Sequence, residues 1–214
     1  MRGHQLLAAL LAAAAGDFPP ADGLTEVLPS PPGRSDAVVG FTAHHMVAAD
    51  LEPEEVLAHL RTDDVGAAMD VRFLAWLGER LHAQPGMLDA VLVADPIDGE
   101  PAIALREVAA ADHPRVRRAA THRSDLRMFE DERRGSVLTI GRGLAGRLEV
   151  SLEVDPDLRR TGVGRALAEA ARTLVPAGEP VFAQVSPGNA ASLRAFLAAG
   201  YRPIGSEVLF LRTG

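Results

Sequence analysis

The chain contains no cysteine and no lysine, although it has 214 residues and 22 basic side chains. The absence of cysteine excludes disulfides, a thiol nucleophile and thiolate ligands for a metal ion. Because every basic residue is an arginine, a lysine Schiff base and lysine self-acetylation are excluded as well. The sequence also lacks an apolar run of the roughly 18 residues that a membrane-spanning helix requires, so we expect no membrane span.

The remaining composition is that of an ordinary globular protein, with 47% hydrophobic and 24% charged residues. The formal net charge of −7 argues against a nucleic acid or an anionic membrane surface as a partner. The apolar segment 6–15 has two interpretations. It fits an amphipathic helix, and it also fits the core of a signal peptide with a cleavage site near Ala13–Ala15.

The first half of the chain mixes predicted helices and strands. Pro53 with the acidic residues after it is typical of a helix start, and apolar periodicity predicts a second helix over 70–81. Strands are expected over 37–46 and 87–94, and a Pro- and Gly-rich loop over 18–34.

A turn signal at 95–99 marks the expected boundary between two domains. We therefore expect a smaller α/β module over 1–97 and a second domain over 101–214. The second domain is expected to be α/β (α+β), with a mixed, largely antiparallel sheet flanked by helices. Its expected strands are 103–108, 126–129, 137–142, 148–154, 181–185 and 208–211, and its expected helices are 113–122, 165–175 and 189–199.

A polar loop over 155–164 connects an expected strand to an expected helix and ends in glycines. Backbone N–H groups at a helix start have no internal partners and bind phosphate oxygens. Gly162 and Gly164 would let the backbone approach a diphosphate. The spacing is neither a Walker loop nor a dinucleotide-binding Gly-x-Gly-x-x-Gly. Alone, the pattern also fits an ordinary Gly-rich loop with solvated arginines.

This loop and a second motif together resemble the GNAT N-acetyltransferase superfamily. The family's cofactor signature, Arg/Gln-x-x-Gly-x-Gly/Ala after a strand ending Val-x-Pro, corresponds to Arg159–Gly164 after Val154–Pro156. The strand, Asn, helix and Gly-Tyr that follow in the family correspond to 181–185, Asn189 and the segment that ends at Gly200-Tyr201. The resemblance covers about 102–211.

The resemblance implies an acetyl-CoA-dependent N-acetyltransferase domain. It implies that the strands 148–154 and 181–185 splay apart and that the pantetheine arm lies in the gap, bonded to the backbone like an added strand. Asn189 would contact the cofactor, cap its helix, or do both. The residues implied to contact acetyl-CoA are Leu152, Glu153, Val154, Arg159, Arg160, Thr161, Gly162, Val163, Gly164, Arg165, Asn189 and Ser192.

The catalytic acid and base are less well defined by the resemblance. Phe196 stands where the family often has a tyrosine acid, and Gln184 stands where some members have a glutamate. The remaining base candidates are Glu149 and Glu153, which alternate with apolar residues and should share a strand face with Ser151. If that face lines the acceptor cleft, desolvation would raise a carboxyl pKa. Direct attack assisted by a bound water stays open beside them.

Other polar clusters receive simpler interpretations. His44 and His45 are adjacent on an expected strand and point to opposite faces, so they cannot chelate one metal together, and we expect no metal site. The basic run is interpreted as a solvated helix face, with recruitment of an acidic acceptor or of the cofactor's 3′-phosphate as the alternative. That run consists of Arg115, Arg117, Arg118 and Arg123.

The sequence therefore predicts a cytoplasmic enzyme that transfers an acetyl group from acetyl-CoA to a primary amine by direct attack. The acceptor is a small-molecule amine or a protein N-terminus. The alternative is a non-catalytic acyl-CoA-binding or sensing module, and a third interpretation is a structural domain whose glycine loop arose by chance. The module 1–97 is expected to cap the acceptor cleft or to form a homodimer contact.

Overall fold

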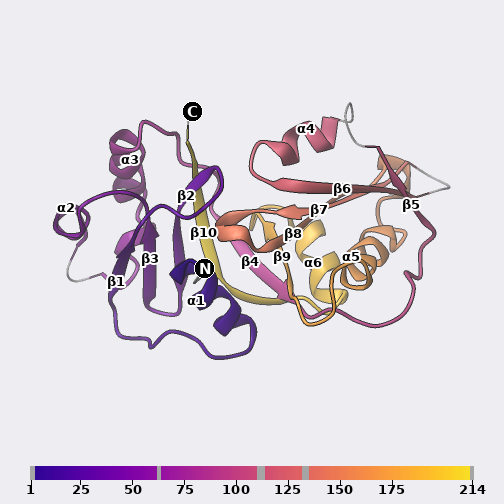
Figure 1. The fold of residues 1–214 in the computed structure, drawn as a ribbon, viewed down its shortest axis with the longest axis horizontal. Helices are drawn as coiled ribbons and strands as arrows, with labels where there is room; N and C mark the ends of the chain where they lie inside the picture. The colour runs from indigo at the N-terminus through magenta and orange to yellow at the C-terminus, as the bar shows by residue number, and fades with distance from the viewer. Residues whose placement is uncertain (1–2, 62–63, 110–113, 132–134, 213–214) are drawn as a thin grey trace. The chain divides into compact units, whose positions relative to one another are not determined.

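A computed structural model describes residues 3–61, 64–109, 114–131 and 135–212, which form six α-helices and ten β-strands (Figure 1). The backbone contacts divide the chain into two compact units. Unit 1 comprises Met1–Ala90, Leu144–Gly146 and Ile204–Gly214, and unit 2 comprises Val91–Gly143 and Arg147–Pro203. These units differ from the predicted domains 1–97 and 101–214 mainly because the end of the chain groups with its beginning. The two predicted domains stay a prediction.

Unit 1 contains four strands in the order β1-β3-β2-β10. The pair β1–β3 is parallel, whereas β3–β2 and β2–β10 are antiparallel. The strands are β1 (Thr25–Leu28), β2 (Ser35–Phe41), β3 (His44–Ala48) and β10 (Arg202–Leu211, in this unit from Ile204). The helices are α1 (Gln5–Ala14), α2 (Pro53–Ala58) and α3 (Val71–Arg80), with the short 3₁₀ helices Ala67–Met69 and Leu144–Gly146.

Two predictions for this region were wrong. The segment 37–46 is not one strand, because β2 and β3 form a hairpin that turns at Thr42 and Ala43. Ala43 adopts a left-handed backbone (φ 52°) although it is not a glycine. Because the turn residues include neither glycine nor proline, the sequence shows no turn signal at this position. The segment 18–34 is not entirely loop, because it contains β1.

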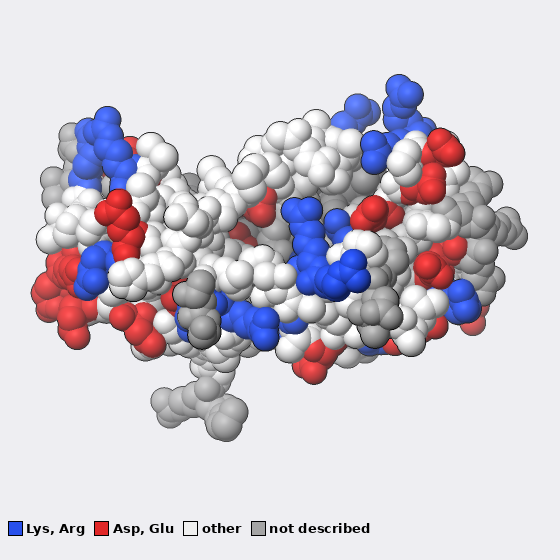
Figure 2. All heavy atoms as spheres, turned by 90° about the horizontal axis from the view of Figure 1, so that it is seen from above, with Lys and Arg blue, Asp and Glu red and all other residues white. Residues whose placement is uncertain are grey.

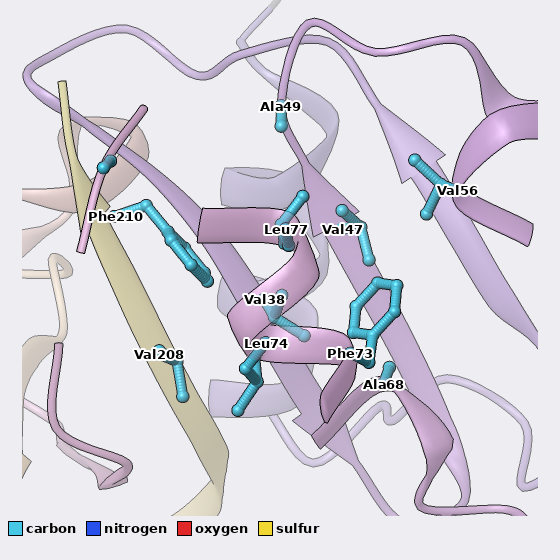
Figure 3. Packing of buried hydrophobic residues seen from close by; sticks show 11 residues of the cluster. Val38, Val47, Ala49, Val56, Ala68, Phe73, Leu74, Leu77, Val208 and Phe210 are labelled. Carbon is cyan, nitrogen blue, oxygen red and sulfur yellow. The ribbon is translucent and has the colours of Figure 1, made fainter. Parts of the chain in front are cut away.

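The helix α3 is the best-predicted element of unit 1. Its start is capped by Asp70, whose side chain accepts a hydrogen bond from the Arg72 N–H at 2.8 Å. One face of α3 packs onto β2 and β10 (Figure 3). The buried residues that meet there are Phe73, Leu74 and Leu77 from the helix and Val38, Val208 and Phe210 from the strands.

Unit 2 contains six strands in the order β4-β9-β8-β7-β6-β5. Neighbours from β5 to β8 are antiparallel, and β8 and β9 are parallel. The strands are β4 (Asp89–Ala94, in this unit from Val91), β5 (Leu105–Val108), β6 (Ser124–Asp131), β7 (Val137–Arg142), β8 (Leu148–Glu153) and β9 (Val181–Val185). The helices are α4 (Pro114–Ala120), α5 (Val163–Thr173) and α6 (Ala190–Ala198), with a 3₁₀ turn at Pro156–Leu158.

This arrangement confirms the predicted fold class, a mixed and largely antiparallel sheet flanked by helices. In Figure 1, α4 lies on one side of β6, β7 and β8, and α5 and α6 lie on the other. Val116 of α4 packs against Met128 and Val137 of the sheet. The predicted helix 113–122 begins at Pro114, and His113 lies outside the described residues.

The longest of the described helices, α5, has 11 residues. In the described ranges no helix combines the length and the apolar character needed to cross a bilayer.

Candidate functional site

The parallel strands β8 and β9 are paired only at their beginnings. The register holds Leu148 opposite Val181 and Glu149 opposite Phe182, and it ends there. The rest of β8, to Glu153, therefore leaves backbone groups along this edge that β9 does not engage. The predicted splay between these strands is present.

The loop after β8 has a backbone that only certain residues adopt easily. Arg160 has φ 67° and Gly162 has φ 93°, and Gly162 is the residue that immediately precedes α5. No atom lies within 4 Å of the position that a Cβ of Gly162 would take. Glycine is thus required at 162 by the left-handed backbone, and its open side leaves room for a ligand.

The start of α5 presents unbonded amides to this open side. The first intrahelical bond runs from the Ala166 N–H to the Gly162 carbonyl, at 3.0 Å. The amides of Val163, Gly164 and Arg165 precede Ala166, so they have no acceptor within the helix. They lie at the positive end of the helix dipole. This is the geometry that binds phosphate oxygens.

Gly164, in the first turn of α5, lies beside Val154 and the helix α6. A Cβ at Gly164 would lie 3.4 Å from Val154 Cγ2 and 3.6 Å from the Cβ of Ala195. These are ordinary van der Waals distances, so the space beside Val154 and α6 does not by itself demand glycine at this position. The approach of a diphosphate to the backbone of Gly164 stays a prediction.

The polar side chains of the loop are exposed. Among the residues that the structure describes, Arg159 and Arg160 have no ion-pair or hydrogen-bond partner for their guanidinium groups, and Arg165 lies 3.9 Å from Glu169. Thr161 is held by a 2.7 Å hydrogen bond from its hydroxyl to the Leu158 carbonyl. Two solvated guanidinium groups beside the helix start fit a phosphate ligand.

Charge elsewhere is mixed in sign. On the face drawn in Figure 2, arginine and carboxylate side chains are interspersed over a mostly uncharged surface. That face shows no broad field of one sign, as a nucleic-acid groove would.

Asn189 caps the helix α6. Its side-chain oxygen accepts a hydrogen bond from the Ser192 N–H at 3.2 Å, and Asn189 itself is exposed. The capping interpretation is therefore confirmed. Contact of Asn189 and Ser192 with a cofactor stays a prediction.

Glu149 lies in a buried ion cluster on the α4 side of the sheet. Its carboxylate accepts hydrogen bonds from Arg123 Nε at 2.7 Å, Arg147 Nε at 2.9 Å and Gln184 Nε2 at 2.8 Å. The Glu149 side chain is 2% exposed, and those of Arg123 and Arg147 are 9% and 0% exposed. Gly143 makes this possible, because a Cβ there would collide with the Glu149 carboxyl group.

The cluster sets the pKa of Glu149 in the direction opposite to the one expected for a base. Burial by itself raises this pKa, but Arg147 and Arg123 together outweigh burial, so the pKa lies below its ordinary value of 4.5. A carboxylate with a lowered pKa and with both oxygens engaged has little tendency to accept a proton. Sequence reasoning missed the cluster, because it had interpreted Arg123 as part of a solvated helix face.

Glu153 and Arg115 define the other end of β8. The Glu153 side chain is 59% exposed, and its Oε2 lies 3.9 Å from Arg115 Nη1. Arg115 Nη2 also donates a 2.6 Å hydrogen bond to the Leu152 carbonyl. Glu149 and Ser151 do share a strand face, as predicted, because Arg123 bonds to both.

The two aromatic residues near the end of α6 pack together in the interior. Phe196 and Tyr201 are 4% and 3% exposed, and their rings meet edge to face with centroids 4.9 Å apart. Burial raises the pKa of the Tyr201 phenol above its ordinary range. Tyr201 therefore packs, as predicted, and does not reach solvent as an acid.

Within the described ranges, no group of three or more His, Asp or Glu side chains is placed to hold a metal ion. His44 Nδ1–H instead donates a 2.9 Å hydrogen bond to the Asp22 carboxylate in unit 1.

Residues 141–210 match the family model of FR47-like proteins. This segment contains the loop Arg159–Gly164 and the Asn189 motif, and it covers about a third of the chain. No curated protein matches the chain.

Several solved structures are similar to this chain at low identity. A GCN5-related N-acetyltransferase from Kribbella flavida is 15% identical, with a TM-score of 0.46 over 98% of this chain and 95% of that protein. An acetyltransferase of the GNAT family from Colwellia psychrerythraea is 11% identical, with a TM-score of 0.41 over 67% of this chain and 63% of that protein, less than two thirds of its length. A conserved protein of unknown function from Staphylococcus epidermidis ATCC 12228 is 13% identical, with a TM-score of 0.43 over 67% of both chains.

These identities and scores are too low to carry an activity from one protein to another. The family-model match falls on the same residues as the two motifs read from the sequence. Residues 141–210 of this chain are therefore similar to FR47-like proteins.

Proposed function

We propose that this protein is an N-acetyltransferase that binds acetyl-CoA in unit 2 and transfers the acetyl group to a primary amine by direct attack. The observation that carries the proposal is the loop Arg159–Gly164, which places exposed guanidinium groups and unbonded helix amides beside the splay of β8 and β9. A phosphate-binding loop next to an open strand edge suits a ligand with a diphosphate and an extended amide-containing arm.

In this proposal the diphosphate binds Arg159, Arg160 and the amides at the start of α5. The pantetheine arm runs along β8 and bonds to the backbone of Leu152, Glu153 and Val154. In the structure Arg115 of α4 donates a hydrogen bond to the Leu152 carbonyl. This carbonyl is therefore accessible to a donor from outside the sheet, as contact with the pantetheine arm requires. Thr161, Val163, Arg165, Asn189 and Ser192 complete the proposed contact set.

Acetyl-CoA would supply the activated acetyl thioester. The chain's own contribution would be to hold the thioester and the amine together, which can lower a barrier by about 7–11 kcal/mol. For proton removal we keep both carboxylates as candidates, and the geometry favours Glu153. Its side chain reaches solvent, whereas Glu149 is enclosed by its cluster. A water bound near Glu153 would serve equally well.

A second candidate function is a non-catalytic acyl-CoA-binding or sensing module. It is favoured by Phe196 at the expected acid position and by the buried Tyr201, which together leave the described part of the chain without an accessible phenol. Both functions require acyl-CoA binding, so binding alone does not separate them.

The test is release of free CoA thiol from acetyl-CoA in the presence of amines. The acceptor panel would contain small amines, amino acids and peptides with free N-termini. An enzyme should release thiol with at least one acceptor, and Glu153→Gln should slow the release more than Arg72→Ala, an exposed control in unit 1. Tight acetyl-CoA binding without release for any acceptor would support the sensing module instead.

We also propose a cytoplasmic location, because acetyl-CoA is a cytoplasmic metabolite. For residues 1–97, capping of the acceptor cleft or a homodimer contact remains our proposal. Sedimentation at several concentrations would decide whether the protein dimerises.

A further inference from the structure

Arg123 connects β8 to β9 just beyond the point where their backbone pairing ends. Its Nε donates to Glu149, its Nη1 donates to the Ser151 hydroxyl at 3.0 Å, and its Nη2 donates to the Gln184 side-chain oxygen at 3.0 Å. Glu149 and Ser151 belong to β8, and Gln184 belongs to β9. One side chain therefore closes the narrow end of the splay, where the two strands begin to separate.

The contacts that hold Arg123 between the two strands include buried ion pairs and are fixed by their neighbours. Arg123, Arg147 and Glu149 are all nearly buried, and the Arg147 guanidinium also lies over the Phe182 ring, 5.2 Å from its centroid. Thr139 fixes Ser151 from β7 through a hydroxyl–hydroxyl bond of 2.7 Å. Moving any of these groups would leave a buried charge or hydroxyl without its partners, which is costly.

The proposed function gives the ligand a direction along β8. If the diphosphate lies at Arg159–Gly164 and the arm runs along Val154 and Leu152, the thioester end points back along the strand toward Ser151. The acyl group would then arrive where Arg123 closes the splay. An acetyl group needs little space there, whereas a longer chain would press methylene groups against buried charges.

We infer that Arg123 is a specificity-determining residue that restricts the acyl group to a short one. This inference rests on the proposed function, and it goes further by naming the structural element that sets acyl size. Gln184 acts with Arg123 as a positioning residue, because it ties the guanidinium group to β9. Ser151 fixes a second nitrogen of the same group.

The experiment compares the binding of acetyl-CoA, hexanoyl-CoA and free CoA by calorimetry. The variants are Arg123→Lys, which keeps the charge but loses the forked contacts, and Gln184→Ala, which frees Arg123 from β9 without removing a charge. Arg106→Ala, at an exposed arginine on β5, is the matched control. Thermal melts establish that each variant is folded.

For the wild type we expect hexanoyl-CoA to bind at least about tenfold more weakly than acetyl-CoA. Arg123→Lys and Gln184→Ala should reduce this ratio to about threefold or less, and Arg106→Ala should leave it unchanged. Equal binding of both acyl-CoAs by the wild type would overturn the acyl limit and leave the proposed function intact. If the roughly tenfold preference for acetyl-CoA over hexanoyl-CoA is unchanged in both variants, the role of Arg123 is overturned. If the folded protein binds no CoA species at all, both proposals fail.

Discussion

Unit 2 contains two groups of arginines with opposite surroundings. Arg123 and Arg147 are nearly buried and share the Glu149 carboxylate, whereas Arg159 and Arg160 are exposed in the loop before α5. The same residue type thus forms part of the interior at one place and faces solvent at another. The comparison shows that a guanidinium group indicates a ligand site only where the protein itself does not already occupy its donors.

The largest expected difference between the two groups is in stability. Glu149→Ala would leave two buried guanidinium groups without their shared carboxylate, so we expect a loss of about 3–5 kcal/mol in the free energy of unfolding. Glu153→Ala, at the exposed end of the same strand, should change it by less than about 0.5 kcal/mol. Urea unfolding measures both. A loss below about 1 kcal/mol for Glu149→Ala would mean that the cluster does not hold the fold together.

The pH dependence of the unfolding free energy tests the buried cluster further, and the expected change is smaller than that caused by Glu149→Ala. The pKa of Glu149 in the folded protein is below 4.5, so the carboxylate stabilises the fold above that pH and loses this contribution as the pH falls through the folded pKa. The difference in unfolding free energy between the wild type and Glu149→Gln should therefore be constant near neutrality and shrink in acid. Urea titrations at a series of pH values would show this, and a difference that grows in acid would contradict the lowered pKa.

The smallest expected effect concerns Arg115, which is intermediate between the two groups. Its side chain is 23% exposed and bonds to the Leu152 carbonyl, which the pantetheine arm is proposed to use. Removing this competitor in Arg115→Ala should tighten acetyl-CoA binding about fivefold, the value of one net hydrogen bond. Calorimetric titration of acetyl-CoA into this variant, with Arg106→Ala as the control, measures the change. Weaker binding would show that Arg115 contacts the bound ligand.

Much of the fold could be predicted because its signals are local. The apolar spacing of Phe73, Leu74 and Leu77 predicts α3 to within one residue at each end. The strand over 137–142 has the predicted bounds. The hairpin of β2 and β3 was missed because Ala43 turns the chain without a glycine or a proline.

The candidate site likewise contains one part that the sequence reveals and one part that it does not. The loop Arg159–Gly164 is contiguous, so its residues are visible in sequence before their geometry is known. The Glu149 cluster is assembled from Arg123 and Gln184, which are 26 and 35 positions away from Glu149 along the chain. No periodicity or motif connects residues at such separations, and only the register of β6 to β9 brings them together.

The central claim is that the exposed arginines, not the buried ones, receive a ligand. The most direct measurement is calorimetric titration of acetyl-CoA into the wild type and into an Arg159→Ala, Arg160→Ala double variant. A double control, Arg72→Ala with Arg106→Ala, removes two other exposed arginines and the same net charge. We predict saturable binding by the wild type and by the control, and a loss of about 30-fold or more in the loop variant. Equal binding by all three proteins, or none by the folded wild type, would contradict the account.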